Sequence, residues 1–265
     1  MYRLRLSIIV FTISVLLYSC YKPELIPFKK AAKAAKGCNA SSFSGVSAAV
    51  DGTPFNGFTK VYDAQGQVIE VVAPIFSLVL DDSIRLKVIY FTHQVKFVNA
   101  ANTSDTVITA SFNNQGRLIQ MTGSGEFANT DFIYTSNRLS SINLIFDVTV
   151  NFEYDSKGNV IRYRSDSGGG LDNAIFTYDL LTKVKDQIYI DNTAGWIYNT
   201  FTLAQIMDWT PDLKPRYKRT HATILFDKTD PWYDVEFTDH TFDSQGRLTS
   251  YLAGEYRMTQ TWNCK

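Results

Sequence analysis

Apolar and polar residues alternate one by one through several stretches of this chain, and turn-forming residues separate those stretches. The alternation is clear at 107–112, 148–154 and 188–190. A period of two places successive side chains on opposite faces of a β-strand. No long segment after residue 37 has the period of an amphipathic helix. The body of the chain is therefore predicted to be almost wholly β.

A motif of seven residues recurs between the predicted strands: an aromatic residue, Asp or Asn, two free positions, Gly, one polar position and an aliphatic residue. Its fullest copies occupy 62–68, 112–118, 154–160 and 242–248. Asp or Asn at the first position of a type I turn accepts hydrogen bonds from nearby backbone N–H groups, and Gly takes the left-handed conformation that closes a hairpin. Each copy therefore predicts a β-hairpin, in which the Asp serves the turn rather than catalysis or a metal. The turn glycines are Gly66, Gly116, Gly158 and Gly246.

Degenerate copies and their spacing extend this pattern along the chain. Residues 134–139 hold a shortened copy, and 178–184 hold one without the glycine. The middle copies recur about every 20 to 24 residues, which is the length of two strands with their turns. Larger gaps predict further turns at 92–94, 203–205 and 227–230. The predicted fold class is all-β, an antiparallel up-and-down meander of about 14 to 18 strands in a strongly curved sheet or closed barrel.

The N-terminus has the pattern of a secretion signal, with Arg3 and Arg5 before an apolar run at 8–17 and a small residue before Cys20. The apolar run is too short to span a bilayer as a helix. Residues 17–20 resemble the bacterial lipobox, and that resemblance implies cleavage before Cys20 and acylation of its thiol. An ordinary secretion signal with a spare cysteine is the alternative.

Composition divides the chain into a signal at 1–19, a tether at 20–37 and one β domain at 38–265. The tether is rich in Lys, Ala and Pro without a strongly apolar face, which indicates a solvated linker. Its lysines lying on anionic lipid headgroups is the alternative. Cys38 and Cys264 stand near the two ends of the β domain, and an oxidising envelope favours a disulfide between them. A pair of free thiols is the alternative.

The sequence contains few candidates for catalytic, metal-binding or cofactor-binding residues. Lys+Arg 26 balance Asp+Glu 26, which argues against broad capture of nucleic acid. His93, His221 and His240 have no metal-ligand spacing, and the motifs of serine hydrolases, zinc proteases and Cys-x-x-Cys proteins are absent from the sequence. The glycine-rich run at 167–170 lacks the Lys and helix that follow a phosphate-binding loop, so it is predicted to be a hairpin tip. No cofactor, metal or catalytic residue is expected.

Two features of the later part of the chain suggest binding. Aromatic side chains at loop mouths can stack on sugar rings or hold an apolar ligand, and core packing is the other interpretation of such residues. The candidates are Trp196, Tyr198, Trp209, Trp232 and Tyr233. The basic run at 214–219 is interpreted as a solvated edge that discourages strand pairing.

The motif copy at 242–248, with the Thr that follows it, resembles the YD repeats of the Rhs family, whose hairpins build a long sheet wound into a shell. Together with the lipobox and the length, the degenerate copies also resemble Bacteroidota lipoproteins of unknown function that are grouped with domains of porin-like β fold. The resemblance rests on scattered motifs over about half of the chain. The array is short and irregular, and no toxin domain follows Leu248, so encapsulation of a toxin is not expected.

A membrane-spanning barrel would alternate in the same way. Polar residues on both alternating sets of 151–164, a final segment without a terminal aromatic residue, and the redundancy of a lipid anchor argue against it. The leading hypothesis is a non-catalytic, lipid-anchored cell-envelope protein that acts as a binding or structural scaffold. It would be an outer-membrane lipoprotein, on either the periplasmic or the surface face, with a membrane, glycan, lipid or envelope protein as partner. A carbohydrate- or lipid-binding protein and an adhesin or secretion-apparatus component are the alternatives.

Overall fold

The computed structural model describes most of the predicted β domain. The described residues are 38–47, 54–74, 83–123, 129–144, 148–165, 173–184, 199–225 and 231–264. Several sequence predictions fall outside them, namely the signal and tether at 1–37, the glycine-rich run at 167–170, the strand at 188–190 and the turn at 227–230.

Strands make up most of the described residues, together with two short helices. The strands are β1 (Cys38–Ser47), β2 (Pro54–Tyr62), β3 (Val68–Pro74), β4 (Ser83–Phe91), β5 (Gln94–Asn99), β6 (Thr106–Phe112), β7 (Leu118–Gly123), β8 (Thr130–Thr135), β9 (Arg138–Asn143), β10 (Thr149–Tyr154), β11 (Val160–Ser165), β12 (Ala174–Lys183), β13 (Tyr217–Leu225), β14 (Pro231–Phe242), β15 (Leu248–Ala253) and β16 (Tyr256–Cys264). The helices are α3 (Asn199–Ile206) and the 3-10 helix η3 (Pro211–Leu213).

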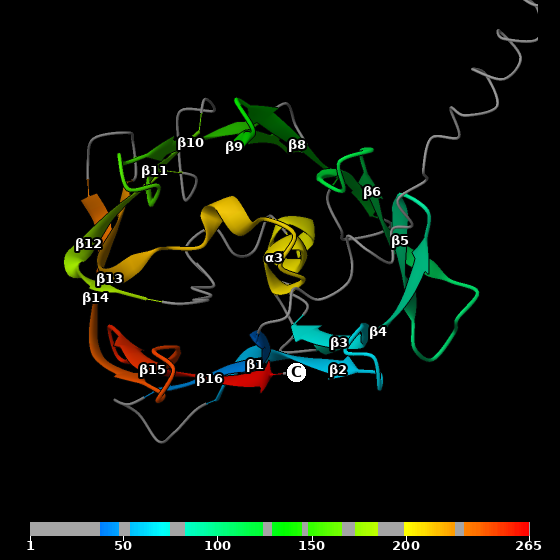
Figure 1. Ribbon diagram of the computed structural model, residues 1–265, viewed down its shortest axis with the longest axis horizontal. Helices are drawn as coiled ribbons and strands as arrows, with labels where there is room; N and C mark the ends of the chain where they lie inside the picture. Colours follow the sequence, from blue (N-terminus) through cyan, green and yellow to red (C-terminus); the bar gives the residue numbers. More distant parts are fainter. Residues whose placement is uncertain are drawn as a thin grey trace, which may run out of the picture.

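The sixteen described strands form one closed barrel (Figure 1). Each strand pairs antiparallel with its neighbours in sequence, and β1 pairs with β16 to close the ring. The all-β, up-and-down architecture predicted from the alternation is therefore confirmed, and the sheet closes rather than remaining open.

The four full motif copies lie in hairpin turns with the same local geometry. In the first copy, the Asp63 carboxylate accepts hydrogen bonds from the backbone N–H groups of Gln65 at 2.9 Å and Gln67 at 2.8 Å. Gly66 N donates to Asp63 O at 3.0 Å, and its φ of 82° is in the left-handed region that favours glycine. The other three turns repeat these contacts, and their glycines have φ between 75° and 89°. The motif therefore sets each turn through local hydrogen bonds.

Two of the predicted turns are wrong. Residues 203–205 belong to α3 instead of a turn. The glycine-free copy at 178–184 closes no hairpin, because β12 continues through it to Lys183. There the Asp179 side chain accepts hydrogen bonds from Leu181 N at 3.0 Å and Thr182 Oγ1 at 2.7 Å, and the pairing with β13 shifts register. Without a glycine to close it, this copy bends the strand edge, and the chain leaves the sheet at residue 184.

Between β12 and β13 in the sequence, the described helix α3 lies inside the ring of strands (Figure 1). Phe201 of α3 packs against Phe132 and Phe152, with ring centroids 6.5 and 6.1 Å apart. Side chains of α3 and η3 belong to the same buried apolar cluster as the inward side chains of the strands. In the described part of the chain, the interior of the barrel is thus occupied by a segment of the protein itself, which we call the luminal segment (residues 199–216).

The outward positions of the strands are mostly polar. Neighbouring strands are joined on this face by side-chain hydrogen bonds and ion pairs, such as Arg85–Glu70 at 3.0 Å and Thr223–Asp234 at 2.8 Å. Exposed apolar side chains, among them Ile69 and Phe91, are interspersed with them. Neither described helix has the length and apolar character that a bilayer-crossing helix requires.

Candidate functional site

The motif copies lie at one end of the barrel. In an antiparallel meander, every second connection lies at the same end. The turns that follow β2, β4, β6, β8, β10 and β14 therefore share one end with the start of β1, the end of β16 and the end of the luminal segment, which precedes β13. We call this the turn end.

Three tyrosine side chains at the turn end form hydrogen bonds to neighbouring hairpins. The Tyr90 hydroxyl donates to Val68 O at 2.9 Å, the Tyr154 hydroxyl to Leu139 O at 2.7 Å, and the Tyr178 hydroxyl to Val160 O at 2.6 Å. Each acceptor is the aliphatic residue that ends a neighbouring motif copy. Burial raises the pKa of Tyr90 and of Tyr154, so these hydroxyl groups remain protonated donors. At Tyr154 and Tyr178, the motif's aromatic residue thus links neighbouring parts of the barrel wall.

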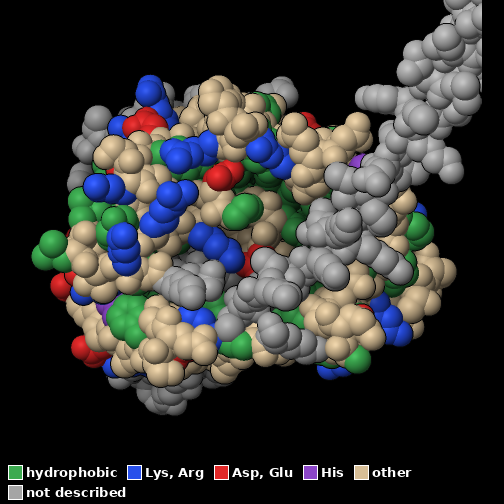
Figure 2. Space-filling view, in the orientation of Figure 1, with side chains coloured by type: hydrophobic (Ala, Val, Ile, Leu, Met, Phe, Trp, Pro, Cys, Tyr) green, Lys and Arg blue, Asp and Glu red, His purple; other side chains and the backbone are tan. Residues whose placement is uncertain are grey.

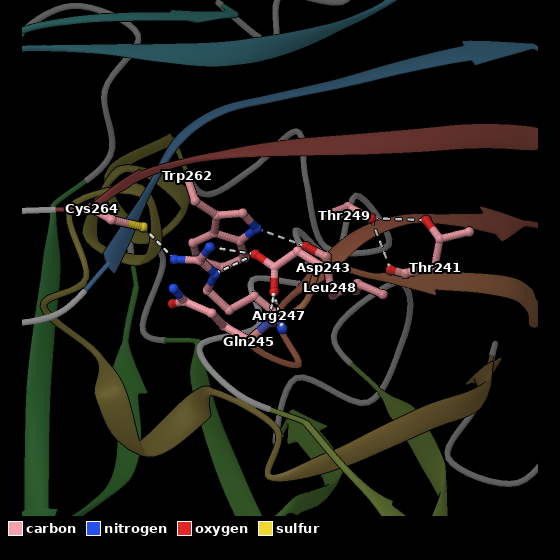
Figure 3. A network of polar contacts seen from close by, with 8 residues as sticks. All are labelled: Thr241, Asp243, Gln245, Arg247, Leu248, Thr249, Trp262 and Cys264. Carbon is pink, nitrogen blue, oxygen red and sulfur yellow. Dashed lines mark hydrogen bonds and ion pairs between the residues drawn. The ribbon is translucent and has the colours of Figure 1, made fainter.

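The last motif copy adds a charged network, drawn in Figure 3. Arg247 Nε donates to Asp243 Oδ2 at 2.6 Å, and its Nη2 forms an ion pair with the same oxygen. Arg247 Nη1 contacts Cys264 Sγ, and Trp262 Nε1 donates to Leu248 O at 2.9 Å. The turn of β14 and β15 is therefore held against the end of β16.

Two further arginines at the turn end lie on tyrosine rings. The Arg117 guanidinium is 5.4 Å from the ring centroid of Tyr134, and that of Arg138 is 4.5 Å from the centroid of Tyr154. These distances are typical of cation–π contacts, which fix the direction of a long side chain. Figure 2 shows a group of Lys and Arg side chains over the region of β9 to β13. We call Arg117, Arg138 and Arg216 the arginine rim.

The luminal segment is tied to the hairpins next to the rim. Leu139 N donates to Asp212 Oδ2 at 3.0 Å, and Arg216 N donates to Asn159 Oδ1 at 2.9 Å. These two hydrogen bonds cross from the luminal segment to β9 and to the β10–β11 turn. They hold the segment in one position relative to the barrel wall.

A buried ion group anchors the same segment at β2. Lys60 Nζ donates to Ile206 O at 2.9 Å and lies 3.5 Å from Asp208 Oδ2, while Lys214 Nζ lies 2.8 Å from Asp208 Oδ1. Burial lowers the pKa of Lys60, which Asp208 partly offsets. The basic run at 214–219 is therefore no solvated edge as predicted: Lys214 is paired, and Arg219 is buried against the Phe176 ring.

The predicted ligand-binding aromatic residues are only partly described. Trp196 and Tyr198 lie outside the described residues, as do the side chains of Trp232 and Tyr233 on β14. Trp209 packs inside the barrel against Phe97 and Phe112, with ring centroids 5.7 and 5.0 Å apart. Ligand binding by these five residues stays a prediction, and the contacts of Trp209 are those of core packing.

The structure places two of the three cysteines and tests neither predicted role. Cys20 lies outside the described residues. Cys38 and Cys264 are partners in the β1–β16 register, and directly opposed antiparallel residues have Cα separations of about 4.5 to 5.5 Å, which a disulfide can bridge. The disulfide itself stays a prediction.

The three histidines are not brought together among the described residues. His93 forms the β4–β5 turn, His221 lies on β13, and His240 on β14 stacks on Tyr251 at 5.9 Å. No group of three or more potential metal ligands occurs in the described ranges. The arginines of the rim were not predicted from the sequence. The signal that could have indicated two of them is a basic residue just before the aliphatic motif position, as at Arg117 and Arg138.

His240 gives the fold a pH dependence. Burial, followed by the nearby Lys218 charge, lowers its pKa from 6.5 to about 4, although a backbone hydrogen bond at Arg219 and the charge of Asp239 oppose this. Between these two pH values the imidazole of the unfolded chain is protonated and that of the folded protein is neutral. The contribution of His240 to stability is therefore present at neutral pH and is lost as the pH falls through this window. We expect His240→Gln to lose less stability than the wild type between pH 7 and pH 4.5.

Urea unfolding at a series of pH values measures this effect. Thr241→Val on the same strand β14 changes a side chain that does not titrate, and serves as the control for the pH slope. Equal slopes for His240→Gln and the wild type would contradict the assignment.

The comparisons with known proteins find similarity in the fold alone. No protein-family model matches the chain, and no curated protein matches it. A porin-like protein from Bacteroides vulgatus ATCC 8482 is similar in structure, with a TM-score of 0.55 and 11% identity, over 85% of this chain and 98% of that one. A porin-like protein from Bacteroides uniformis ATCC 8492 has a TM-score of 0.49 and 14% identity, over 84% and 98% of the two chains. At its low identity, the Bacteroides vulgatus likeness shows that this chain shares that protein's overall fold, and no more.

Proposed function

We propose that this chain is a non-catalytic, lipid-anchored protein of the bacterial cell envelope, whose filled barrel serves as a rigid binding scaffold. The observation that carries this proposal is the polarity of the barrel. Its interior is mostly apolar and holds the luminal segment, and its outer wall carries charged and polar side chains. An outer wall of this kind is not suited to lipid, and the luminal segment takes up space that an open pore would need.

The outer wall supports an aqueous position for the barrel. Barrels that span a membrane carry an outward apolar band about 25 Å tall, and charged side chains within it are destabilising. Here Lys87, Glu153 and Arg164 are exposed on three different strands. Attachment to a membrane then needs a separate anchor, which Cys20 supplies in this proposal.

The start of the barrel fits such an anchor. β1 begins at Cys38 at the turn end, so an acyl chain on Cys20 would hold that end toward the lipid layer. A fully extended tether of residues 20–37 reaches roughly 60 Å. The porin-like description of the Bacteroides vulgatus structure agrees with an envelope location.

Metabolic labelling with an alkyne fatty acid, followed by membrane fractionation, tests this proposal. We expect the full chain to carry the label and to sediment with the outer membrane, whereas Cys20→Ala should be unlabelled and soluble in the periplasm. Cys264→Ser is the control, because it removes a thiol from the barrel and leaves the lipid. Labelling or membrane retention of Cys20→Ala at the wild-type level would refute the anchor.

The arginine rim favours a second, narrower version of this function, a carbohydrate- or lipid-binding protein. In that case the ligand binds at the turn end and not in the lumen, because Phe201, Leu203 and Ala204 of α3 are buried inside the barrel. The adhesin or secretion-apparatus role is kept as a hypothesis without a structural observation of its own.

A further inference from the structure

We infer that Arg138 and Arg216 at the turn end form a binding site for an oxyanion, in the first place a phosphate group. This inference rests on the proposed function and deepens it by naming the ligand chemistry of the scaffold. The site is made by three segments far apart in sequence: the start of β9, the β10–β11 turn and the end of the luminal segment.

The two guanidinium groups converge over the glycine of the β10–β11 turn. A Cβ on Gly158 would lie 3.1 Å from Arg216 Cζ and 3.3 Å from Arg138 Nη2. Both groups therefore pack closely on Gly158 and lie next to each other there, with no room for a Cβ between them and the glycine. The left-handed glycine, with φ of 89°, lets the two arginines approach the turn this closely.

Each arginine is held in place by contacts that leave its charge available. Arg138 lies on the Tyr154 ring at 4.5 Å, and the backbone of Arg216 is fixed by Arg216 N to Asn159 Oδ1 at 2.9 Å and by Val184 N to Arg216 O at 3.1 Å. The Asn159 side chain is itself buried and donates to Asp155 Oδ2 at 2.7 Å. A preorganised site loses little conformational entropy when a ligand binds.

No carboxylate forms an ion pair with either arginine within the described residues, although two lysines nearby each have such a partner. Lys214 pairs with Asp208, and Lys218 pairs with Asp179 at 3.2 Å. No ion pair of Arg138 or Arg216 occurs among the described residues.

The two acids of this region accept hydrogen bonds from backbone and amide donors. Asp155 accepts them from its own turn, and Asp212 Oδ2 accepts one from Leu139 N. The two adjacent guanidinium charges repel each other, and an anion bound to both relieves that repulsion.

The chemistry of the pair selects the ligand class. Guanidinium groups present planar forks of N–H donors that match phosphate oxygens, and a fork can bind two of them at once. Two adjacent forks suit a single tetrahedral oxyanion such as inorganic phosphate or a phosphomonoester, bound beside the pair and not in the space next to Gly158. The same chemistry is available from free phosphate or from a phosphorylated lipid headgroup, and the turn end is the end that a lipid on Cys20 would bring to the membrane.

Two measurements on the full chain test the site. Isothermal titration with inorganic phosphate gives the affinity of the wild type and of Arg138→Gln, Arg216→Gln and Arg164→Gln. Phenylglyoxal labelling, read by mass spectrometry, gives the accessibility of each arginine with phosphate, with phosphatidylcholine vesicles, and with the same vesicles containing phosphatidic acid. The labelling needs no variant, so it stands even where a substitution disturbs folding.

We expect phosphate to protect Arg138 and Arg216 from labelling and to leave Arg164 reactive. Each of the two rim substitutions should weaken phosphate binding about tenfold or more, since each removes charge-assisted hydrogen bonds. Arg164→Gln should bind as the wild type does, because it removes one charge from the outer wall of the same hairpin. Protection by phosphatidic acid vesicles alone would support the site with a lipid headgroup as its source.

Two results would overturn the inference: no protection of either arginine by phosphate or by phosphatidic acid vesicles, or equal phosphate affinity in the wild type and both rim variants. Neither result touches the lipid anchor, which the Cys20→Ala experiment tests separately. Conversely, phosphate binding with an unlabelled Cys20 would keep the site and remove the anchor.

Discussion

Gly57→Ala is expected to destabilise the barrel by more than about 3 kcal/mol, because the added methyl group has no space between β1 and β2. A Cβ on Gly57 would overlap the backbone carbonyl of Phe43 and lie 2.7 Å from Ser44 Cα. Both neighbours are backbone, so no flexible side chain can move aside. The register between β1 and β2 already shifts next to Phe43, and the substitution should prevent the two strands from pairing there.

Gly246→Ala is the matched control for this prediction. No atom lies within 4 Å of a Cβ added there, so the cost is only that of a left-handed backbone, with φ of 77°. That cost is about 1 kcal/mol. Denaturant unfolding of both variants measures the difference, and a Gly57→Ala protein as stable as Gly246→Ala would show that β1 and β2 are not as close as described.

Phe201→Ala is expected to cost about 3 to 5 kcal/mol, since it leaves a cavity where the luminal segment packs against the wall. The Phe201 ring contacts Phe132 on β8 and Phe152 on β10, so its loss removes contacts to two strands at once. The hydrogen bonds of Asp212 and Arg216 to the hairpins remain and should keep the segment inside the weakened barrel. Thermal and urea unfolding measure the loss.

Leu181→Ala is the control for this second prediction. Leu181 is 95% exposed on β12, and its removal should change the free energy of unfolding by less than about 0.5 kcal/mol. Equal stability of Phe201→Ala and Leu181→Ala would mean that the luminal segment contributes nothing to the fold.

The turns and the strand pattern were predictable from sequence because their causes are local. The Asp63 carboxylate and the Gly66 backbone set their hairpin within a few residues, and the same chemistry recurs in the other full copies. Alternation then fixes which side chains face inward, and the number of hairpins makes a strongly curved sheet or a closed barrel the expected result. These predictions need no knowledge of contacts between distant segments.

The luminal segment was not predictable in this way. A helix that is buried on all sides has no apolar stripe facing a polar one, and α3 shows this: Phe201, Leu203, Ala204 and Ile206 point in several directions and are all buried. Its sequence therefore carries no helical period.

The arginine rim depends on proximity that sequence spacing does not express, since Arg138, Gly158 and Arg216 meet only in the closed barrel. The interpretation of the basic run at 214–219 as a solvated edge was wrong for the same reason. The buried environment of Arg219 comes from strands on either side of it.

The pairing of β1 with β16 has a consequence for how the protein acquires its structure. Its hydrogen bonds join residues such as Ser41 and Thr261, which are 220 positions apart. Contacts of such long range pay the largest loop-closure entropy and form slowly. While that seam is open, the sheet has two long edges of unpaired backbone groups, which are templates for association with other chains. Nascent molecules are thus most vulnerable to aggregation in the interval before the seam forms.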